Sequence, residues 1–364
     1  MVTTQAAKSE AAAKFRTKLE AQIEAGRASA LALFEKVQRE VPEDRIANTH
    51  GFRFDLQGEQ TLVLQTGDNP QQTVHHHALH QILERVGIPR AYATSLSERG
   101  PWGAELLVQN LNRLYEGDAA KRALVRAIGS QVRAVLSDKF RRLDSRPLLD
   151  AFAEGCQEIG AVPIEGTGGD TRVAIKALIP QVFEPVPGEV LAFGLQWSNS
   201  DFGNGANSVR GFILRLACLN GMTMEEALRE IHLGRKLSDD VAFSSETYRL
   251  DTATTVSAMR DVIRGSLAPA KIDQQMEIIR RAAGAEVDPR AAFATMQRNY
   301  GLLKAEVEAV RETYNNGGVE QLPPGNSMYR MSNAISWIAK SAETPERRLE
   351  LEQVAGEVLL KAAA

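Results

Sequence analysis

Apolar and polar positions alternate along the chain with two different periods. A helical period runs through residues 5–41, where the apolar positions are Phe15, Leu19, Ile23, Ala30, Leu33, Phe34 and Val37. A period of two, typical of strands with one buried face, governs three segments that each contain a short turn: 51–66, 122–138 and 161–180. The apolar run "EVLAFGLQWSNS" (189–200) predicts a further strand, and "VRGFILRLACL" (209–219) predicts a strand or a helix.

Helical periodicity also fills the gaps between these strands and most of the chain beyond Gly221. The segments with this pattern are 73–89, the stretch after Pro101, 146–160, 223–237, 245–265, 271–283, 288–313, 328–341 and 345–362. Short turns pair strands antiparallel, so the order predicts an α+β fold: an antiparallel β-hairpin sheet with packed helices, followed by a largely helical C-terminal region. We divide the chain into an N-terminal helix (1–44), an α+β core (45–222) and a helical C-terminal region (223–364).

Composition and charge narrow the class of protein. The 364 residues carry a net charge of −3, so no field of the whole molecule attracts nucleic acid or a membrane. The two cysteines, Cys156 and Cys218, lie in apolar runs, which favours a reducing compartment over a disulfide scaffold. No apolar run approaches the roughly 20 residues of a membrane span, and the N-terminus lacks the apolar core of a signal peptide. We therefore expect a cytoplasmic protein with no membrane partner.

Positive charge is concentrated in one segment. Residues 121–146 contain eight basic and two acidic side chains, a net charge of +6. Strand periodicity places Arg122 and Arg126 on one face of a hairpin, and Arg172 and Lys176 on one face of the next. Guanidinium groups suit phosphate oxygens, so we expect these cations to contact a phosphate backbone: Arg122, Arg126, Arg133, Arg141, Arg142, Arg172 and Lys176. The alternative is a solvated sheet face whose cations pair with nearby acids.

A polar loop interrupts the apolar strands between residues 197 and 207. Trp197 and Phe202 offer flat faces on which unpaired bases can stack, and Asn199 and Asn207 offer neutral hydrogen-bonding groups. Gly203 and Gly205 permit a positive φ, so backbone amides in the loop could hold an anion. The alternative is a turn-rich connection capped by its own Asn and Asp side chains.

Candidate metal ligands and nucleophiles form no strong motif. Four of the six histidines are His75, His76, His77 and His80. The glutamate of a zincin motif is missing, so the segment is interpreted as a helix that packs through its apolar side rather than as a metal site. The sequence contains no nucleophile elbow, P-loop or dinucleotide-binding fingerprint. We expect neither a catalytic residue nor a metal site.

Several ordered blocks resemble the phage/plasmid-like protein family, a domain of unknown function carried by phages, prophages and plasmids. They are "HHHALHQILERVGIPRAYATSL", "RAVLSDKFRRLDSRPLLDAF", "WSNSDFGNGANSVRGFILRLACLNGM" and "MSNAISWIAKSA". The resemblance covers about residues 50–340, transfers no catalytic residue and implies a mobile-element setting. At the level of the fold alone, the expected hairpins, basic sheet face and helical appendages are similar to RecT/Red-beta-type single-strand annealing proteins.

These features predict a homo-oligomeric protein, a ring or a filament, that binds single-stranded DNA or RNA, with strand annealing in recombination as its activity. Pairing itself drives annealing, so no cofactor is expected. Two alternatives stay open. One is a metal-dependent nuclease using Asp138, Asp144 or Asp201. The other is an interaction factor whose charged face binds a host defence or replication protein.

Overall fold

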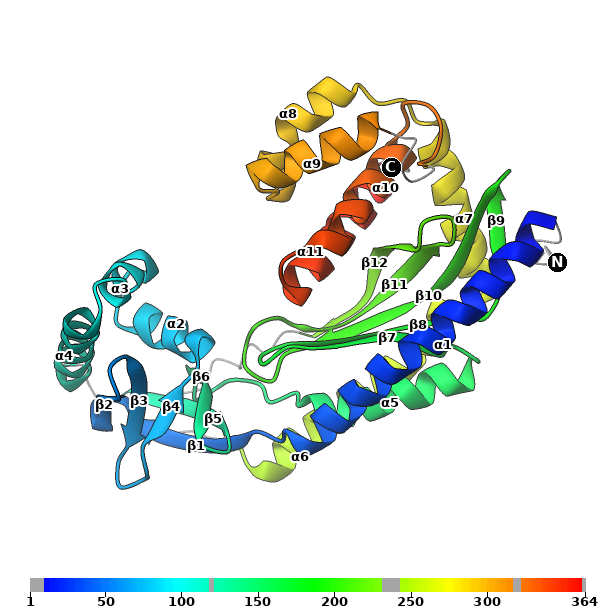
Figure 1. Cartoon of the computed structure of the whole chain (residues 1–364). Coiled ribbons are helices and arrows are strands. Elements are labelled where there is room, and N and C mark those ends of the chain that lie inside the picture. Colours follow the sequence, from blue (N-terminus) through cyan, green and yellow to red (C-terminus); the bar gives the residue numbers. More distant parts are fainter. Residues whose placement is uncertain (1–9, 118–120, 231–242, 317–321, 362–364) are drawn as a thin grey trace.

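The computed structural model describes residues 10–117, 121–230, 243–316 and 322–361. They form two sheets with helices packed on both, followed by a helical region that starts at Ser245 (Figure 1). The predicted α+β class with a helical C-terminal region is confirmed. The strands form two separate six-stranded sheets, however, where the sequence predicted one.

The first sheet curls strongly because the chain joins its two edges directly. Its strand order is β1 (Glu43–Asn48), β5 (Arg122–Ile128), β6 (Gln131–Ser137), β4 (Gln72–Val74), β3 (Thr61–Thr66) and β2 (Phe52–Gln57). Neighbouring strands are antiparallel except β4 and β6. Although β1 and β2 lie at opposite edges, only the 3-10 turn Thr49–Gly51 separates them in the chain.

Three short helices cover the first sheet and close its own hydrophobic core. They are α2 (His76–Arg85), α3 (Arg90–Ser97) and α4 (Pro101–Gly117). Leu111 and Tyr115 of α4 pack against Phe52 and Phe54 of β2, and the Tyr115 hydroxyl donates to the Ile82 carbonyl oxygen at 3.0 Å. This lobe therefore has a core separate from the main one.

The second sheet carries the largest core of the molecule. Its order is β12 (Asn220–Glu230), β11 (Asn207–Arg215), β10 (Glu189–Asn199), β8 (Val173–Leu178) and β7 (Val162–Gly168), with β9 (Phe183–Val186) also paired to β10. The long helix α1 (Glu10–Arg39) lies along β7, and α5 (Ser145–Glu158) packs on α6 (Ser245–Ser266). In Figure 1, α5 and α6 lie below this sheet, α7 lies beside its end near β9, and α8 to α11 lie above it.

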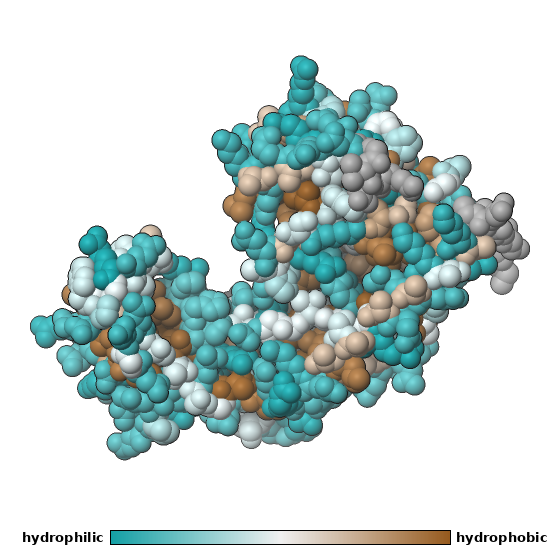
Figure 2. Space-filling model, viewed as in Figure 1, coloured by the Kyte–Doolittle hydropathy of each residue, from teal (hydrophilic) through white to brown (hydrophobic). Residues whose placement is uncertain are grey.

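The remaining helices build the C-terminal region. They are α7 (Pro269–Gly284), α8 (Pro289–Tyr300), α9 (Lys304–Asn315), α10 (Met328–Ile338) and α11 (Pro345–Lys361), the last of which packs on β12. Among the helices that the structure describes, none combines the length and apolarity needed to span a bilayer. Figure 2 shows a hollow with a largely hydrophilic rim between the first-sheet lobe and this helical region.

Two predicted helices differ from the structure. Residues 223–230 belong to strand β12, because pairing with β11 outweighs the helix-forming side chains of this segment, while 231–237 lie outside the described residues. The segment 288–313 is two helices, since Gly301 takes a φ of 65° and ends α8. The strands β4 and β9 were not predicted because their three and four residues are too few to show an alternation. Strand β1 was not predicted either, because its sequence EDRIAN contains few apolar residues.

Candidate functional site

The polar loop between β10 and β11 joins the two sheets. The Gln81 side chain of α2 donates to the Phe202 carbonyl oxygen at 3.0 Å, and a ring nitrogen of His77 lies 2.9 Å from the same oxygen. On the other side, the Ser200 hydroxyl donates to the Thr171 carbonyl oxygen of the β7–β8 turn at 2.6 Å. The loop turns at Gly203 and Gly205, which take the predicted positive φ values of 78° and 135°. The loop is therefore a structural joint.

The aromatic and amide side chains predicted to contact bases are buried. Trp197, Asn199 and Asn207 have no exposed surface, and Phe202 is 6% exposed. The indole of Trp197 stacks near Phe152 of α5, with ring centroids 6.3 Å apart. The prediction that Trp197 and Phe202 stack bases, and that Asn199 and Asn207 hold the strand, is therefore wrong for this conformation. An indole enclosed by its own sheet and helix presents no face to a ligand.

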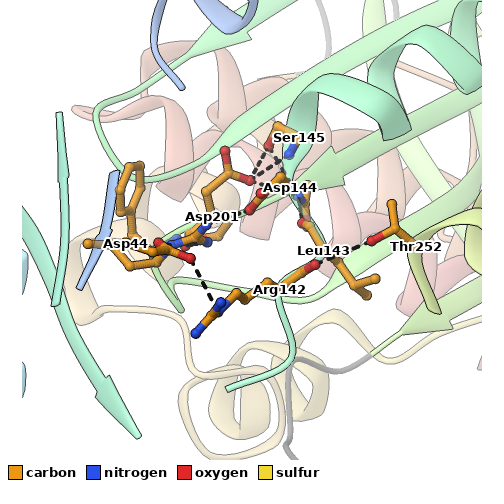
Figure 3. A network of polar contacts seen from close by, with 11 residues as sticks. Asp44, Arg142, Leu143, Asp144, Ser145, Asp201 and Thr252 are labelled. Atoms are coloured by element: carbon orange, nitrogen blue, oxygen red, sulfur yellow. Dashed lines mark hydrogen bonds and ion pairs between the residues drawn. The ribbon is translucent and has the colours of Figure 1, made fainter. Parts of the chain in front are cut away.

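Asn199 instead belongs to a polar network at the start of α5. Its amide donates to the Leu143 carbonyl oxygen at 2.8 Å and to the Ser145 hydroxyl at 3.1 Å. The Asp201 carboxylate accepts hydrogen bonds from the Ser145 backbone amide and hydroxyl, both at 2.7 Å (Figure 3). Burial raises the pKa of Asp201 to about 6, and the nearby Asp144 carboxylate adds to the rise.

Arg126 is the central cation of this joint. It is 1% exposed, and its guanidinium donates to Asp44 and Asp144 carboxylates at 2.6 Å each and to the Asp201 carbonyl oxygen at 2.7 Å. The carboxylates hold the pKa of Arg126 above its usual range despite the opposing effect of burial. A buried arginine with three acceptors links β1, β5, the start of α5 and the polar loop. It has no donor surface left for a phosphate.

Most of the other predicted phosphate contacts are also ion-paired. Arg122 pairs with Asp138 at 2.9 Å, Arg133 with Glu40 at 2.7 Å, Arg141 with Asp251 at 2.6 Å and Arg142 with Asp44 at 3.2 Å. The last contact lacks hydrogen-bond geometry, and Arg142 also lies over the Tyr248 ring. Lys176 is buried between Glu352 at 2.8 Å and Glu165 at 3.3 Å.

Arg172 is the one predicted cation for which no carboxylate pair is found within the described ranges. Its guanidinium donates a long hydrogen bond of 3.4 Å to the Ser198 hydroxyl, and its enclosed Nε finds no hydrogen-bond partner there. Burial lowers the pKa of Arg172, against the raising effect of Glu350 and Glu346 on α11. Arg172 lines a small pocket of about 30 Å³ together with Arg133, and Lys176 is buried beside Glu352 of α11.

The prediction of a groove of cations beside Trp197 is therefore wrong. The basic residues of the two hairpins mostly bind carboxylates, which is the alternative that the sequence left open. Arg126 and Lys176 are buried, whereas Arg122 is half-exposed. Arg122 lines a much larger open pocket than the one that Arg133 and Arg172 line.

That pocket has a volume of about 430 Å³ and lies at one end of the first sheet. Four cations line it: Arg85 from α2, Lys121 and Arg122 at the start of β5, and Lys139 just after β6. Asp138 is the one carboxylate among its described lining residues, and Asn48 and Ser137 add neutral polar groups. The lining residues carry a net formal charge of +3. We call this site the cationic pocket.

Fixed backbone contacts hold the cationic pocket in shape. The Lys121 carbonyl oxygen accepts from both the amide (2.8 Å) and the hydroxyl (3.0 Å) of buried Thr49. The Arg85 guanidinium donates to the Leu136 carbonyl oxygen at 3.0 Å. One Asp138 oxygen accepts from both Nε and Nη2 of Arg122 at 3.1 and 2.9 Å. The sequence placed Lys121 and Lys139 in the basic segment, but Arg85 belongs to a different element and could be added only with the fold known.

The nuclease and metal hypotheses find no supporting cluster. Across the parts of the chain that the structure describes, no group of three or more His, Cys, Asp or Glu side chains is arranged to hold a metal ion. Asp138, Asp144 and Asp201 each accept hydrogen bonds from Arg122, Arg126 or Ser145. His75 caps α2 through a hydrogen bond from the His77 amide and lies 3.5 Å from Asp170.

Comparisons of the chain with protein-family models, with curated proteins and with solved structures found no match.

Proposed function

We propose that the protein binds single-stranded nucleic acid, with the cationic pocket as the anchor for phosphate. The observation that carries the proposal is the meeting of four cations from three segments of the chain around one open volume. Guanidinium and ammonium groups bind phosphate oxygens through charge-assisted hydrogen bonds. The net charge of −3 means that the rest of the surface gives little help to a polyanion.

Anisotropy of a fluorescein-labelled oligothymidine at 50 and 200 mM salt tests the proposal. Affinity should fall steeply with salt, because each neutralised phosphate releases counterions. The double variant Lys121→Gln/Arg122→Gln should bind more weakly and with a shallower salt slope. The control is Arg311→Gln, since Arg311 on α9 is exposed and paired with Glu308 at 2.9 Å much as Arg122 is with Asp138. Salt-independent binding, or binding unaffected in the double variant, contradicts the proposal.

We further propose that the protein forms homo-oligomers and anneals complementary strands. We also propose a cytoplasmic location and the mobile-element setting that the family resemblance implies. The two cysteines are buried and unpaired, as expected in a reducing compartment. Negative-stain imaging with and without oligothymidine tests the assembly, and rings or filaments would support it. Mixing complementary labelled strands with the protein tests annealing, and an unchanged rate of duplex formation would rule that activity out.

A further inference from the structure

We propose that the outer surface of helices α3 and α4 stacks unpaired bases, with the indole of Trp102 as the main platform. This inference rests on the proposed function and deepens it by assigning the bases of the bound strand to a second surface. Tyr92 of α3 and Trp102 and Leu114 of α4 define that surface, which we call the α3–α4 face. Both helices lie at the end of the first-sheet lobe that is far from the second sheet (Figure 1).

The apolar side chains of the α3–α4 face are exposed to water. Trp102 is 53%, Leu114 43% and Tyr92 41% exposed, whereas Trp197 has no exposed surface. None of the first three belongs to a hydrophobic cluster of the described residues, although the neighbouring Leu111 does. Single exposed apolar side chains are common on proteins, but several gathered on one surface mark an interaction site.

The two helices place these side chains in one row. Trp102, Leu106, Asn110 and Leu114 are spaced four residues apart, so they form an inclined row along α4. The Asn110 amide donates to the Tyr92 hydroxyl at 3.2 Å, which holds α3 beside the middle of this row. The α3–α4 face therefore presents an indole at its start, a phenol beside its middle and an aliphatic side chain at its end.

Arg99 makes a nucleotide the occupant that fits best. Its exposed guanidinium lies over the Trp102 ring, 5.7 Å from the centroid, and no carboxylate pair of Arg99 is found in the part of the chain that the structure describes. An exposed aromatic ring beside an arginine suits a single strand, because every base has a flat π face. Residues 90–117 contain three arginines and three glutamates, so stacking rather than an excess of charge supplies the affinity.

Helix α4 connects this face to the cationic pocket. Tyr115 in its last turn stacks on Phe52 with ring centroids 5.5 Å apart, and Phe52 directly follows the turn that holds Thr49. Thr49 in turn donates to the Lys121 carbonyl oxygen at the pocket. The 17 residues of α4 span about 25 Å. One strand can therefore contact both the pocket and Trp102 when it extends over several nucleotides.

An oligothymidine and an abasic oligonucleotide of the same length separate stacking from phosphate binding. Both carry the same backbone charges and one fluorescein label, but the abasic strand has no bases to stack. We expect the wild-type protein to bind the oligothymidine about tenfold more tightly, the effect of about one stacked base. Trp102→Ala should remove this advantage and leave the affinity for the abasic strand unchanged, whereas Trp102→Phe, which keeps a flat ring, should retain part of it.

Salt distinguishes the α3–α4 face from the cationic pocket. Trp102→Ala should weaken oligothymidine binding by the same factor at 50 and 200 mM salt, because stacking releases no counterions, whereas Lys121→Gln/Arg122→Gln should make the salt slope shallower. Leu303→Ala is the matched control, since Leu303 is 62% exposed and lies at the start of α9. It should bind both strands as the wild type does, and unfolding midpoints check that each variant is folded.

Equal oligothymidine affinities of Trp102→Ala and Leu303→Ala overturn the inference. If those affinities still fall with salt and in Lys121→Gln/Arg122→Gln, the proposed function stands and the stacking surface alone is wrong. Sedimentation velocity tests a second copy of the chain as the occupant. If Trp102→Ala dissociates an assembly and weakens binding of both strands equally, the α3–α4 face joins subunits and the inference is again wrong. If neither strand binds the wild-type protein, both proposals fail.

Discussion

The indole Nε1 of Trp197 donates a hydrogen bond of 2.8 Å to Oδ1 of Asn207, and both side chains are completely buried. Trp197 of β10 lies opposite Val209 of β11, two residues from Asn207, near the point where the strands leave the sheet for the polar loop. The Asn207 side-chain oxygen therefore satisfies the indole donor, whereas the buried Nδ2 of Asn207 finds no hydrogen-bond partner among the described residues. The polar groups of this segment stabilise the joint between the sheets, which leaves ligand binding to the surface.

Replacing Asn207 should destabilise the fold. In Asn207→Ala the Trp197 indole loses its acceptor in a closed environment, which we expect to cost about 1–3 kcal/mol of unfolding free energy. Urea denaturation followed by circular dichroism measures the change. Asn204→Ala is the matched control, because Asn204 is only partly buried and its amide donates to the Thr171 hydroxyl at 2.9 Å. Equal effects of the two substitutions would contradict the enclosed geometry at Trp197.

Arg126 should matter far more to stability than Arg122, although the two lie on the same strand. Arg126→Met removes a buried cation, leaves Asp144 without its arginine and leaves Asp44 with only its contact to Arg142, so we expect a loss of about 3–5 kcal/mol. Arg122→Met breaks one half-exposed pair and should cost no more than about 1 kcal/mol. Chemical denaturation of both variants measures the difference, and similar unfolding midpoints would show that the joint does not depend on Arg126.

Asp201 should give the protein a pH-dependent contribution to stability. The folded-state pKa of about 6 lies above the ordinary value of 3.8, so the folded protein binds this proton more tightly than the unfolded chain. Stability from this group therefore rises as the pH falls through 6. Between pH 7 and pH 5 the wild type should gain about 1 kcal/mol relative to Asp201→Asn.

Three histidines act in the opposite direction, which is why the comparison uses a variant. Burial lowers the pKa values of His75, His77 and His80, so their protonation below the ordinary value of 6.5 favours the unfolded chain. All three histidines remain in Asp201→Asn, and subtracting the two stability curves removes their effect. Curves that stay parallel from pH 7 to pH 5 would show that Asp201 is already ionised in the folded protein at pH 5.

Because α1 packs closely on β7, a side chain added at Gly26 should strongly destabilise the protein. A Cβ added there would lie 1.7 Å from the Ile164 carbonyl oxygen, so Gly26→Ala should displace the helix and lower the thermal midpoint by many degrees. Gly265→Ala in α6 is the control, because its Cβ would meet nothing within 4 Å. Alanine favours helix over glycine, so that variant should gain up to about 1 kcal/mol. Equal midpoints for the two variants would contradict the packing of α1.

The sequence predicted the hairpins well because each one is a short turn between two alternating runs that are adjacent in the chain. The alternating runs on either side of Gly129 became β5 and β6, and the apolar positions of α1, such as Leu19 and Leu33, are buried as expected. Residues 223–230 were predicted helical because Glu, Ala, Leu and Arg favour helices. They form a strand because β11 offers a partner edge, and a partner distant along the chain cannot be read from local periodicity.

The site was harder to predict than the fold, because the carboxylates that bind the predicted cations lie far from them in the sequence. The basic segment was visible, but Asp44, Glu40 and Asp251, which bind Arg126, Arg133 and Arg141, come from other elements. Likewise Arg85 reaches the cationic pocket from α2. The sequence supplied the sign and number of the charges. Which cations were neutralised and which gathered around a pocket depended on tertiary contacts.

The distance along the chain between α1 and its partner strand imposes an order on biosynthesis. Every strand of the first sheet lies between Glu43 and Ser137, so that lobe can assemble while the ribosome is still making the rest. Helix α1 is made earlier but meets β7 only after Val162 has emerged. Until then the apolar side chains that α1 buries against β7, Leu19 and Leu33 among them, lack the strand that covers them in the folded protein.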